Sequence, residues 1–339
     1  MKKHRLGLIG CGWIAHFYAR ILPRLSDRVE VVWCADPDTL RSGEIAHRTN
    51  ARSIPDYRQG LGEVDAVCVL VPHHLHRPIT IDCLAAGCHV LLEKPIARTV
   101  EEADAIIAAA ERSGRTLMVA YPHRYRKSMR VFKDAVVGGN YGELFMLDAL
   151  MDESFADYTL GWIAQRETLG GGVFFSASPH MLDVMLWIAG EPQAVSMVGT
   201  RAAAQMEGED TAVSILKFKS GVVGTTRHTW ASPRTRIWYT MNAMCQQAHI
   251  TLTTQPLDDI VATGADCRWL TRITALSQTG DAELLHESDE GLDLEPEIIH
   301  FLDCLDSGQT PETDGATARK IVELVQNAYR EADERGTNV

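Results

Sequence analysis

The chain has 339 residues, of which 45% are hydrophobic and 23% are charged, and this composition is typical of a globular protein with about two domains. Its formal net charge of −12 argues against nucleic acid or an anionic membrane as a partner, because polyanion-binding proteins usually carry a basic excess. No apolar run approaches the roughly 18 residues of a membrane helix. The eight cysteines form no C-x-x-C pair, which favours reduced, buried thiols in the cytoplasm over disulfides or a metal site.

Strands and helices alternate over the first 120 residues. The predicted strands are Arg5–Ile9, Val29–Ala35, Asp65–Val71, His89–Leu92 and Thr116–Ala120. Helical patterns separate them; one ends before Gly87, and another begins at a capping box over residues 99–102. Because parallel strands need crossover helices, this alternation predicts a doubly wound α/β domain of the Rossmann type over residues 1–123.

After residue 123 the pattern changes from α/β alternation to mostly strands. The predicted strands are Leu144–Leu150, Ala194–Thr200, Ala212–Lys219, Val222–Trp230, Arg236–Met241 and His249–Thr253. Helices are expected near Ser128–Val136, at Pro179–Ala189, and along a C-terminal apolar stripe from Ala318 to Ala332. Residues 124–339 are therefore predicted to form an α+β domain with a large, mostly antiparallel open sheet, and the C-terminal helix is expected to pack on one of the two domains.

A glycine-rich turn joins the first strand to the first helix. Residues 10–15 read G-x-G-x-x-A, in which Gly10 allows the tight turn, Gly12 lets the backbone approach a pyrophosphate, and Ala15 lets helix and strand pack closely. The positive end of the helix dipole then faces the phosphates. Asp36 ends the second strand, where an acidic side chain binds the ribose 2′-OH of NAD and repels the 2′-phosphate of NADP. NAD is therefore the expected cofactor, with NADP less favoured.

Three polar segments follow strands of the first domain, at the edge where ligands bind in such sheets. These segments are Val71–His76, Glu93–Pro95 and Tyr121–Arg124. In the second domain, Gly170–Gly172 precedes Ser176 and His180, which are four residues apart and would share one face of a continuous helix.

These motifs together resemble the Gfo/Idh/MocA family of oxidoreductases. Residues 86–95 resemble its A-G-K-H-V-x-x-E-K-P segment, residues 71–76 its T-P-N-x-x-H segment, and residues 170–183 its G-G-G-x-x-x-D-x-G-x-H-x-x-D segment. The resemblance implies that Lys94 is catalytic and that His180 is its partner. This chain departs from the family at Ser176, which stands where the family has aspartate. The resemblance also implies a homo-oligomer, a dimer or a tetramer, assembled through the open sheet.

The residues expected at the site follow from the motifs and from this resemblance. The expected cofactor contacts are Gly10, Gly12, Trp13, Ile14, Asp36, Val71, Pro72, His73, His76, Glu93 and Lys94. The expected catalytic residues are Lys94 and His180, and the expected substrate contacts are Arg124, Tyr158, Trp162 and Ser176. Arg124 is alternatively an ion-pair partner, and the two aromatic residues are alternatively part of the core. No metal site is expected, because adjacent histidines cannot share one face of a strand.

The chemistry of Lys94 fits that implied role. Oxidation of an alcohol by hydride transfer also requires removal of the hydroxyl proton, and a lysine that is partly desolvated beside a cationic nicotinamide has its pKa lowered toward neutrality. Because Ser176 supplies no carboxylate to orient His180, a carboxylate from Asp152, Glu153 or Asp157 is a further hypothesis.

The sequence therefore predicts an NAD(P)-dependent dehydrogenase that acts on a CH–OH group of a small polyol: a sugar, a sugar derivative or a cyclitol. Two alternatives stay open. One is an enzyme that holds NAD tightly and performs glycoside cleavage or an epimer-type change without net redox chemistry. The other is a non-catalytic sensor of NAD or sugar. The only feature that favours it is Ser176, which replaces the aspartate of the family.

Overall fold

The computed structural model describes residues 3–155, 160–235, 237–257, 268–289, 291 and 293–338, and the chain divides into two compact units. The first unit holds residues 1–121 and 294–322, and the second holds 122–293 and 323–339. The domain boundary predicted from the sequence lies after residue 123. The structure places it after Tyr121 and also assigns a C-terminal segment to the first unit.

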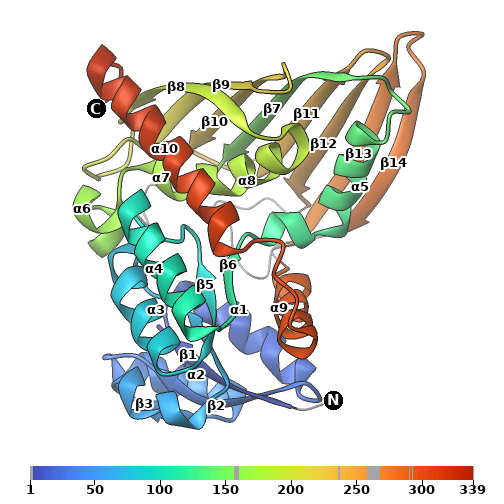
Figure 1. Cartoon of the computed structure of the whole chain (residues 1–339). Helices are drawn as coiled ribbons and strands as arrows, with labels where there is room; N and C mark the ends of the chain where they lie inside the picture. The colour runs from blue at the N-terminus through green and yellow to red at the C-terminus, as the bar shows by residue number, and fades with distance from the viewer. Residues whose placement is uncertain are drawn as a thin grey trace. The chain divides into compact units, whose positions relative to one another are not determined.

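The first unit is built on a six-stranded parallel sheet (Figure 1). Its strands are β1 (His4–Ile9), β2 (Val29–Ala35), β3 (Arg52–Ile54), β4 (Ala66–Val69), β5 (His89–Glu93) and β6 (Leu117–Ala120). They lie in the order β3-β2-β1-β4-β5-β6, which is the order of dinucleotide-binding Rossmann domains. The predicted doubly wound fold is therefore confirmed. The three-residue strand β3 was not anticipated.

Helices connect these strands, and local side-chain chemistry fixes where they begin. The helices are α1 (Trp13–Ile21), α2 (Thr39–Thr49), α3 (His76–Ala85) and α4 (Val100–Ser113), with short 3₁₀ turns η1 (Leu22–Leu25), η2 (Tyr57–Gln59), η3 (Leu61–Glu63) and η4 (His73–Leu75). Asp38 caps α2, and Thr99 caps α4 by accepting a hydrogen bond from the backbone N–H of Glu102. Gly114 ends α4 in the left-handed conformation, as expected for a helix C-terminus.

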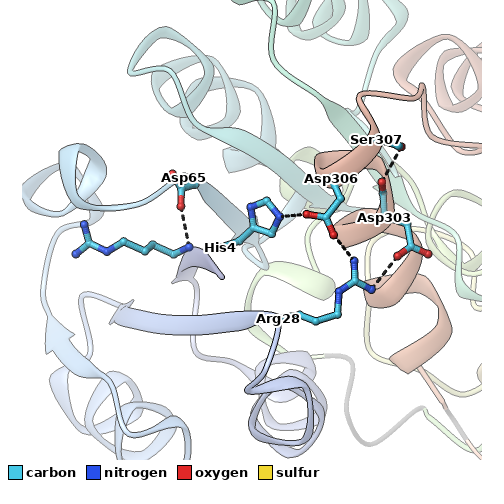
Figure 2. Close-up of polar contacts among 7 residues, drawn as sticks. His4, Arg28, Asp65, Asp303, Asp306 and Ser307 are labelled. Carbon is cyan, nitrogen blue, oxygen red and sulfur yellow. Dashed lines mark hydrogen bonds and ion pairs between the residues drawn. The ribbon is translucent and has the colours of Figure 1, made fainter. Parts of the chain in front are cut away.

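The chain returns to the first unit at helix α9 (Glu295–Ser307), which ion pairs tie to the start of the sheet. Arg28 contacts Asp303 at 2.8 Å and Asp306 at 2.7 Å, and the His4 ring lies 2.8 Å from the same Asp306 carboxylate (Figure 2). Hydrogen bonds from His4 and Arg28 lower the pKa of Asp306. Further along, the backbone of Thr313 accepts a hydrogen bond from the N–H of Val119 in β6.

The second unit contains an eight-stranded sheet that is antiparallel except where β7 and β10 pair. Its strands are β7 (Leu144–Asp152), β8 (Pro192–Thr200), β9 (Thr211–Phe218), β10 (Val223–Thr229), β11 (Tyr239–Cys245), β12 (Ala248–Pro256), β13 (Trp269–Ser277) and β14 (Ala282–Asp289). The order is β14-β13-β12-β11-β7-β10-β9-β8, which confirms the predicted large, mostly antiparallel sheet. Strands β13 and β14 were not predicted. The edge strand β14 is largely exposed and shows no apolar alternation, whereas β13 does alternate between more and less buried residues.

One face of this sheet is covered by helices, and the alternation along its strands follows from that. In β11, for example, Tyr239, Met241 and Ala243 are buried, whereas the residues between them are partly exposed. The helical segments of this unit are η5 (Pro122–Tyr125), α5 (Lys127–Val137), η7 (Gly161–Ile163), α6 (Arg166–Leu169), α7 (Val173–Ser176), α8 (Ser178–Ala189) and the second part of α10 (Gly315–Arg335).

Within the described residues, no single helix has the length and apolar character to cross a membrane. One bent pair, Arg166–Ser176 with Ser178–Ala189, meets the length and composition criteria jointly, with a bend of 48°.

Candidate active site

The glycine-rich turn of the first unit has two glycines with different surroundings. Gly10 adopts a φ of +90°, and a Cβ atom there would lie 2.5 Å from the carbonyl oxygen of Leu70 at the end of the neighbouring strand. Gly10 is therefore required by the fold itself. A Cβ atom at Gly12 would meet no atom within 4 Å. The space beside Gly12 is open, which fits the close approach of a pyrophosphate to the backbone.

Helix α1 begins directly after this turn. Gly12 occupies its N-cap position, and its first turn carries no acidic side chain. The N-terminal amide groups of the helix are therefore neither capped by a side chain nor opposed by a nearby negative charge within it, as an anion site requires. Trp13 is 57% exposed and packs edge-on against Phe17, with ring centroids 4.8 Å apart, while Ile14 is half-buried.

Asp36 lies at the end of β2, and its carboxylate hydrogen-bonds the glycine-rich turn. One oxygen of its carboxylate accepts a hydrogen bond from the N–H of Cys11 at 2.8 Å, and the other accepts from the N–H of Asp38 at 2.9 Å. These bonds orient the carboxylate beside the glycine-rich turn. Nearby Arg41 makes an ion pair with Asp38 at 3.3 Å. The open space at Gly12 and the fixed acid at Asp36 together fit NAD, since a 2′-phosphate at this carboxylate would be repelled.

His76 connects two of the segments that were expected to contact the cofactor. Its Nδ1 lies 2.8 Å from the carbonyl oxygen of Pro95, and its Nε2 lies 2.9 Å from that of Val71. Burial lowers the pKa of His76 to about 4, so the ring is neutral at physiological pH and donates to one of these carbonyls. The His76 ring thus lies between the loop after β4, which contains Val71 and Pro72, and the segment after β5, and it hydrogen-bonds one of the two. His73 is buried, and its ring packs edge-on against His76.

Glu93 and Lys94 stand at the end of β5. Glu93 closes the strand, and one of its carboxylate oxygens accepts a hydrogen bond from the backbone N–H of Lys94 at 3.2 Å. Burial raises the pKa of Glu93 to about 7, and the positive charge of Lys94 opposes that rise. The peptide bond between Lys94 and Pro95 is cis, and Lys94 is half-buried.

In the second unit, Gly171 and Gly172 allow other groups to pack closely against the backbone. A Cβ atom at Gly171 would lie 2.5 Å from the hydroxyl of Tyr329, and one at Gly172 would lie 2.2 Å from the carbonyl oxygen of Glu209. Gly172 donates its N–H to the Tyr329 hydroxyl at 3.0 Å, and that hydroxyl donates to the Glu209 carboxylate at 2.6 Å. Glu209 in turn accepts a hydrogen bond from the N–H of Phe174. Sequence reasoning missed Glu209 and Tyr329, because neither lies near the glycines in the chain.

Ser176 and His180 lie on different helices. Ser176 ends α7 and is buried, whereas His180 lies in the first turn of α8 and is half-buried. The two helices meet at Ala177, so the pair does not lie on one continuous helix, which was the condition for a shared face. Pro179, at the start of α8, has no N–H for a helical hydrogen bond, which favours a break at this point.

Arg124 binds Asp183. Its Nε donates to Oδ2 at 3.0 Å and its Nη2 donates to Oδ1 at 2.6 Å, and both side chains are buried. This pair ties η5 to α8, the helix that carries His180. The geometry favours the ion-pair alternative for Arg124.

Ring contacts lead from His180 to a second arginine, Arg126, within the second unit. The ring of His123 packs edge-on against His180, with centroids 5.2 Å apart, and also against Tyr239 at 4.8 Å. The Tyr239 hydroxyl accepts a hydrogen bond from Arg126 at 2.8 Å. The sequence analysis did not select His123, Arg126 or Tyr239, although two of them flank Arg124 in the segment that follows β6.

The remaining expected residues are placed as follows. Tyr158 and Asp157 lie outside the described residues. Trp162 is half-buried in η7, and its carbonyl oxygen accepts a hydrogen bond from Thr168. Asp152 pairs with Arg227 at 2.6 Å. Glu153 accepts hydrogen bonds from two indoles, those of Trp230 and Trp238.

Comparison with known proteins gives a consistent picture. A family described as "Oxidoreductase family, NAD-binding Rossmann fold" matches residues 4–121, and the "GFO/IDH/MocA C-terminal domain" matches residues 129–251. The chain is 29% identical to 1,5-anhydro-D-fructose reductase of Ensifer adhaerens over 225 residues, which cover 65% of this chain and 67% of the relative. It is 26% identical to D-glucoside 3-dehydrogenase of Escherichia coli K12 over 215 residues, which cover 60% of this chain and 61% of the relative.

Solved structures agree on the fold. A levoglucosan dehydrogenase in complex with NADH superposes with a TM-score of 0.83 at 20% identity, over 98% of each chain. At this identity the likeness shows the fold alone.

Proposed function

Because the chain belongs to the Gfo/Idh/MocA family of oxidoreductases and carries its NAD-binding Rossmann fold, we propose that it is a dehydrogenase acting on a CH–OH group of a sugar, a sugar derivative or a cyclitol. The choice of NAD as the cofactor rests on one observation. Asp36 holds its carboxylate beside the open backbone at Gly12, which suits an unphosphorylated ribose. The named relatives that act on sugars support the substrate half.

The residues proposed to hold NAD come from the strand ends of the first unit. Gly12 and the N-terminus of α1, with Trp13 and Ile14, would receive the pyrophosphate, and Asp36 would bind the ribose. Val71 and Pro72 would flank the remainder of the cofactor, in a loop beside the His76 ring. When bound, NAD accepts the hydride that leaves the carbinol carbon of the substrate.

Lys94 is proposed as the general acid and base. Oxidation of the hydroxyl group releases a proton as the hydride leaves, and the Nζ of Lys94 would accept that proton; in the reverse direction its ammonium group would donate one to the forming hydroxyl. His180 is proposed to assist by hydrogen-bonding the substrate hydroxyl. Ser176 is proposed to add a hydroxyl that both donates and accepts. Tyr158 and Trp162 are proposed to stack on a sugar ring.

Arg124 is proposed to act on the substrate indirectly, by positioning the helix that carries His180. Its ion pair with Asp183 joins η5 to α8. A loss of this pair would displace His180, which lies in the first turn of α8.

The test is NADH formation at 340 nm with NAD or NADP and a panel of sugars, glycosides, sugar acids and inositols, with Lys94→Ala as the variant. We expect turnover with NAD that Lys94→Ala reduces by about 10²–10⁴-fold while NAD binding persists. NAD binding without NADH release from any substrate would contradict the dehydrogenase. Release of a cleaved or epimerised product under that condition would then identify an enzyme without net redox change, and absence of any product would identify a sensor.

The outer face of the eight-stranded sheet is proposed to assemble copies of the chain into a homo-oligomer. Val198 and Val213 pair across β8 and β9 on this face, and Ile215 next to them is 58% exposed. Such an apolar surface is better covered by a partner than by water. Light scattering of the wild type and of Ile215→Asp tests this; a monomeric wild type would contradict it.

A further inference from the structure

Arg126 is a buried cation of the second unit whose guanidinium has unsatisfied hydrogen-bond donors. Only 2% of the residue is exposed, and its Nη1 donates to the Tyr239 hydroxyl at 2.8 Å. Its Nε and Nη2 are buried and have no hydrogen-bond partner within the part of the chain that the structure describes. Burial of a charge is costly unless hydrogen bonds compensate it, so two unbonded N–H groups on one guanidinium indicate that a ligand supplies the acceptors.

The chemistry of that ligand follows from the geometry of Arg124, two residues earlier. Nε and Nη2 form one edge of a guanidinium, with two parallel N–H groups. On Arg124, the same edge binds the Asp183 carboxylate at 3.0 and 2.6 Å. Arg126 presents this edge without an acceptor. A planar fork of this kind matches the two oxygens of a carboxylate, which makes carboxylate the first choice among anions.

Neighbouring rings hold Arg126 in place without neutralising it. Its guanidinium lies 5.2 Å from the centre of the Trp238 ring and 5.6 Å from that of Tyr239. Cation–π contacts of this kind stabilise and orient the group, but they leave its N–H donors available.

Ring contacts also connect Arg126 to the proposed substrate contacts. Tyr239, which accepts the hydrogen bond from Arg126, packs against His123, and His123 packs against His180. All four residues belong to the second unit. Arg126 therefore lies two ring contacts beyond the histidine that is proposed to hold the substrate hydroxyl.

We propose that Arg126 binds a carboxylate of the substrate through Nε and Nη2, so that the substrate is a sugar acid: an aldonic or uronic acid with a free hydroxyl to oxidise. Tyr239 positions the guanidinium by accepting from Nη1. This inference rests on the proposed dehydrogenase function and names the substrate class of that same site.

The first experiment compares matched substrates. kcat and KM are measured with NAD for D-glucuronate against D-glucose, D-galacturonate against D-galactose, and D-gluconate, with D-glucose 6-phosphate as the phosphate arm. We expect the wild type to prefer acids. Arg126→Gln is expected to lower kcat/KM for the preferred acid by about 100-fold, mainly through KM, because a buried charge-assisted contact is lost. Lys127→Gln, which removes an exposed charge from the adjacent residue, serves as the matched control and is expected to keep the acid preference.

A second experiment measures binding without turnover. The melting temperature of the NAD-loaded protein is recorded with and without D-glucuronate, D-galacturonate and D-gluconate, for the wild type, Arg126→Gln, Arg126→Lys and Lys127→Gln. We expect an acid to raise it in the wild type and in Lys127→Gln, to raise it less in Arg126→Lys, which keeps the charge but loses the fork, and to leave Arg126→Gln unchanged. Arg126→Lys also serves if Arg126→Gln does not fold.

The outcomes separate this inference from the proposed function. Turnover of neutral sugars without preference for an acid, or a preference for the phosphate, would overturn carboxylate recognition and leave the dehydrogenase standing. Binding of an acid that depends on Arg126, without NADH formation, would support the recognition and contradict the dehydrogenase. A lack of any Arg126-dependent binding of these acids would overturn the inference outright.

Discussion

Arg124 and Asp183 form a bidentate ion pair in the second unit, with N–O distances of 3.0 and 2.6 Å and almost no exposure to solvent. Removal of one partner would leave the other as a buried, uncompensated charge, which costs about 3–5 kcal/mol. We predict that Arg124→Met and Asp183→Asn each lower the free energy of unfolding by about that amount in urea titrations. The Arg124→Met/Asp183→Asn double variant should lose less than the sum of the two.

The exposed pair of Arg272 and Glu287 supplies the control for that prediction. Its atoms approach to 2.6 Å, but both side chains are largely solvated. Arg272→Met should therefore cost less than about 1 kcal/mol. Equal costs for Arg272→Met and Arg124→Met would show that burial of the Arg124 pair does not matter for stability.

The two glycines of the nucleotide turn should respond differently to the same substitution. Gly10→Ala places a methyl group 2.5 Å from the Leu70 carbonyl oxygen at a φ of +90°, so we expect the melting temperature of the NAD-free protein to fall. The methyl group of Gly12→Ala meets no atom of the described residues within 4 Å. This variant should leave that melting temperature nearly unchanged. It should weaken the binding of NAD by about tenfold or more, because the methyl group occupies the space proposed for the pyrophosphate. Unchanged NAD affinity in Gly12→Ala, measured by calorimetry, would place the pyrophosphate elsewhere.

Asp36 should decide the choice between NAD and NADP. Asp36→Ser removes the charge that would repel a 2′-phosphate but keeps a small acceptor near the N–H of Cys11. We expect kcat/KM to fall for NAD and to rise for NADP, so that their ratio shifts by at least about tenfold. Asp38→Asn, which changes the cap of α2 two residues away, is the control and should leave the ratio unchanged. If the ratio stays constant in Asp36→Ser, the acid does not contact the ribose.

The buried carboxyl group of Glu93 should make stability depend on pH. Burial raises its pKa to about 7 from the ordinary value of 4.5, so the folded state holds this proton more tightly than the unfolded state does. Its contribution to stability is complete below about pH 4.5 and is lost as the pH rises through about 7. Between pH 5 and 8 the unfolding free energy of the wild type should therefore fall by about 1–3 kcal/mol more than that of Glu93→Gln.

A surface glutamate gives the comparison for this pH dependence. Glu30→Gln changes an exposed side chain of β2 in the same unit and should follow the wild-type profile. If Glu93→Gln also follows it in urea titrations at both pH values, the Glu93 carboxyl group does not titrate differently in the folded state.

The sequence by itself determined the fold and the family. Period-2 and helical patterns, the turn around Gly10 and Gly12, and the acid at Asp36 are all local features, and each depends on neighbours a few residues away in the chain. The parallel sheet, the large second sheet and the oxidoreductase family could be read from them for that reason.

Only the tertiary structure decided which polar side chains meet. Asp183 is 59 residues from Arg124, Tyr239 is 113 residues from Arg126, and Glu209 is 120 residues from Tyr329. Spacing along the chain carries no signal for such pairs, because the register of strands and the packing of helices set them. The unsatisfied donors of Arg126 likewise follow from the tertiary structure alone.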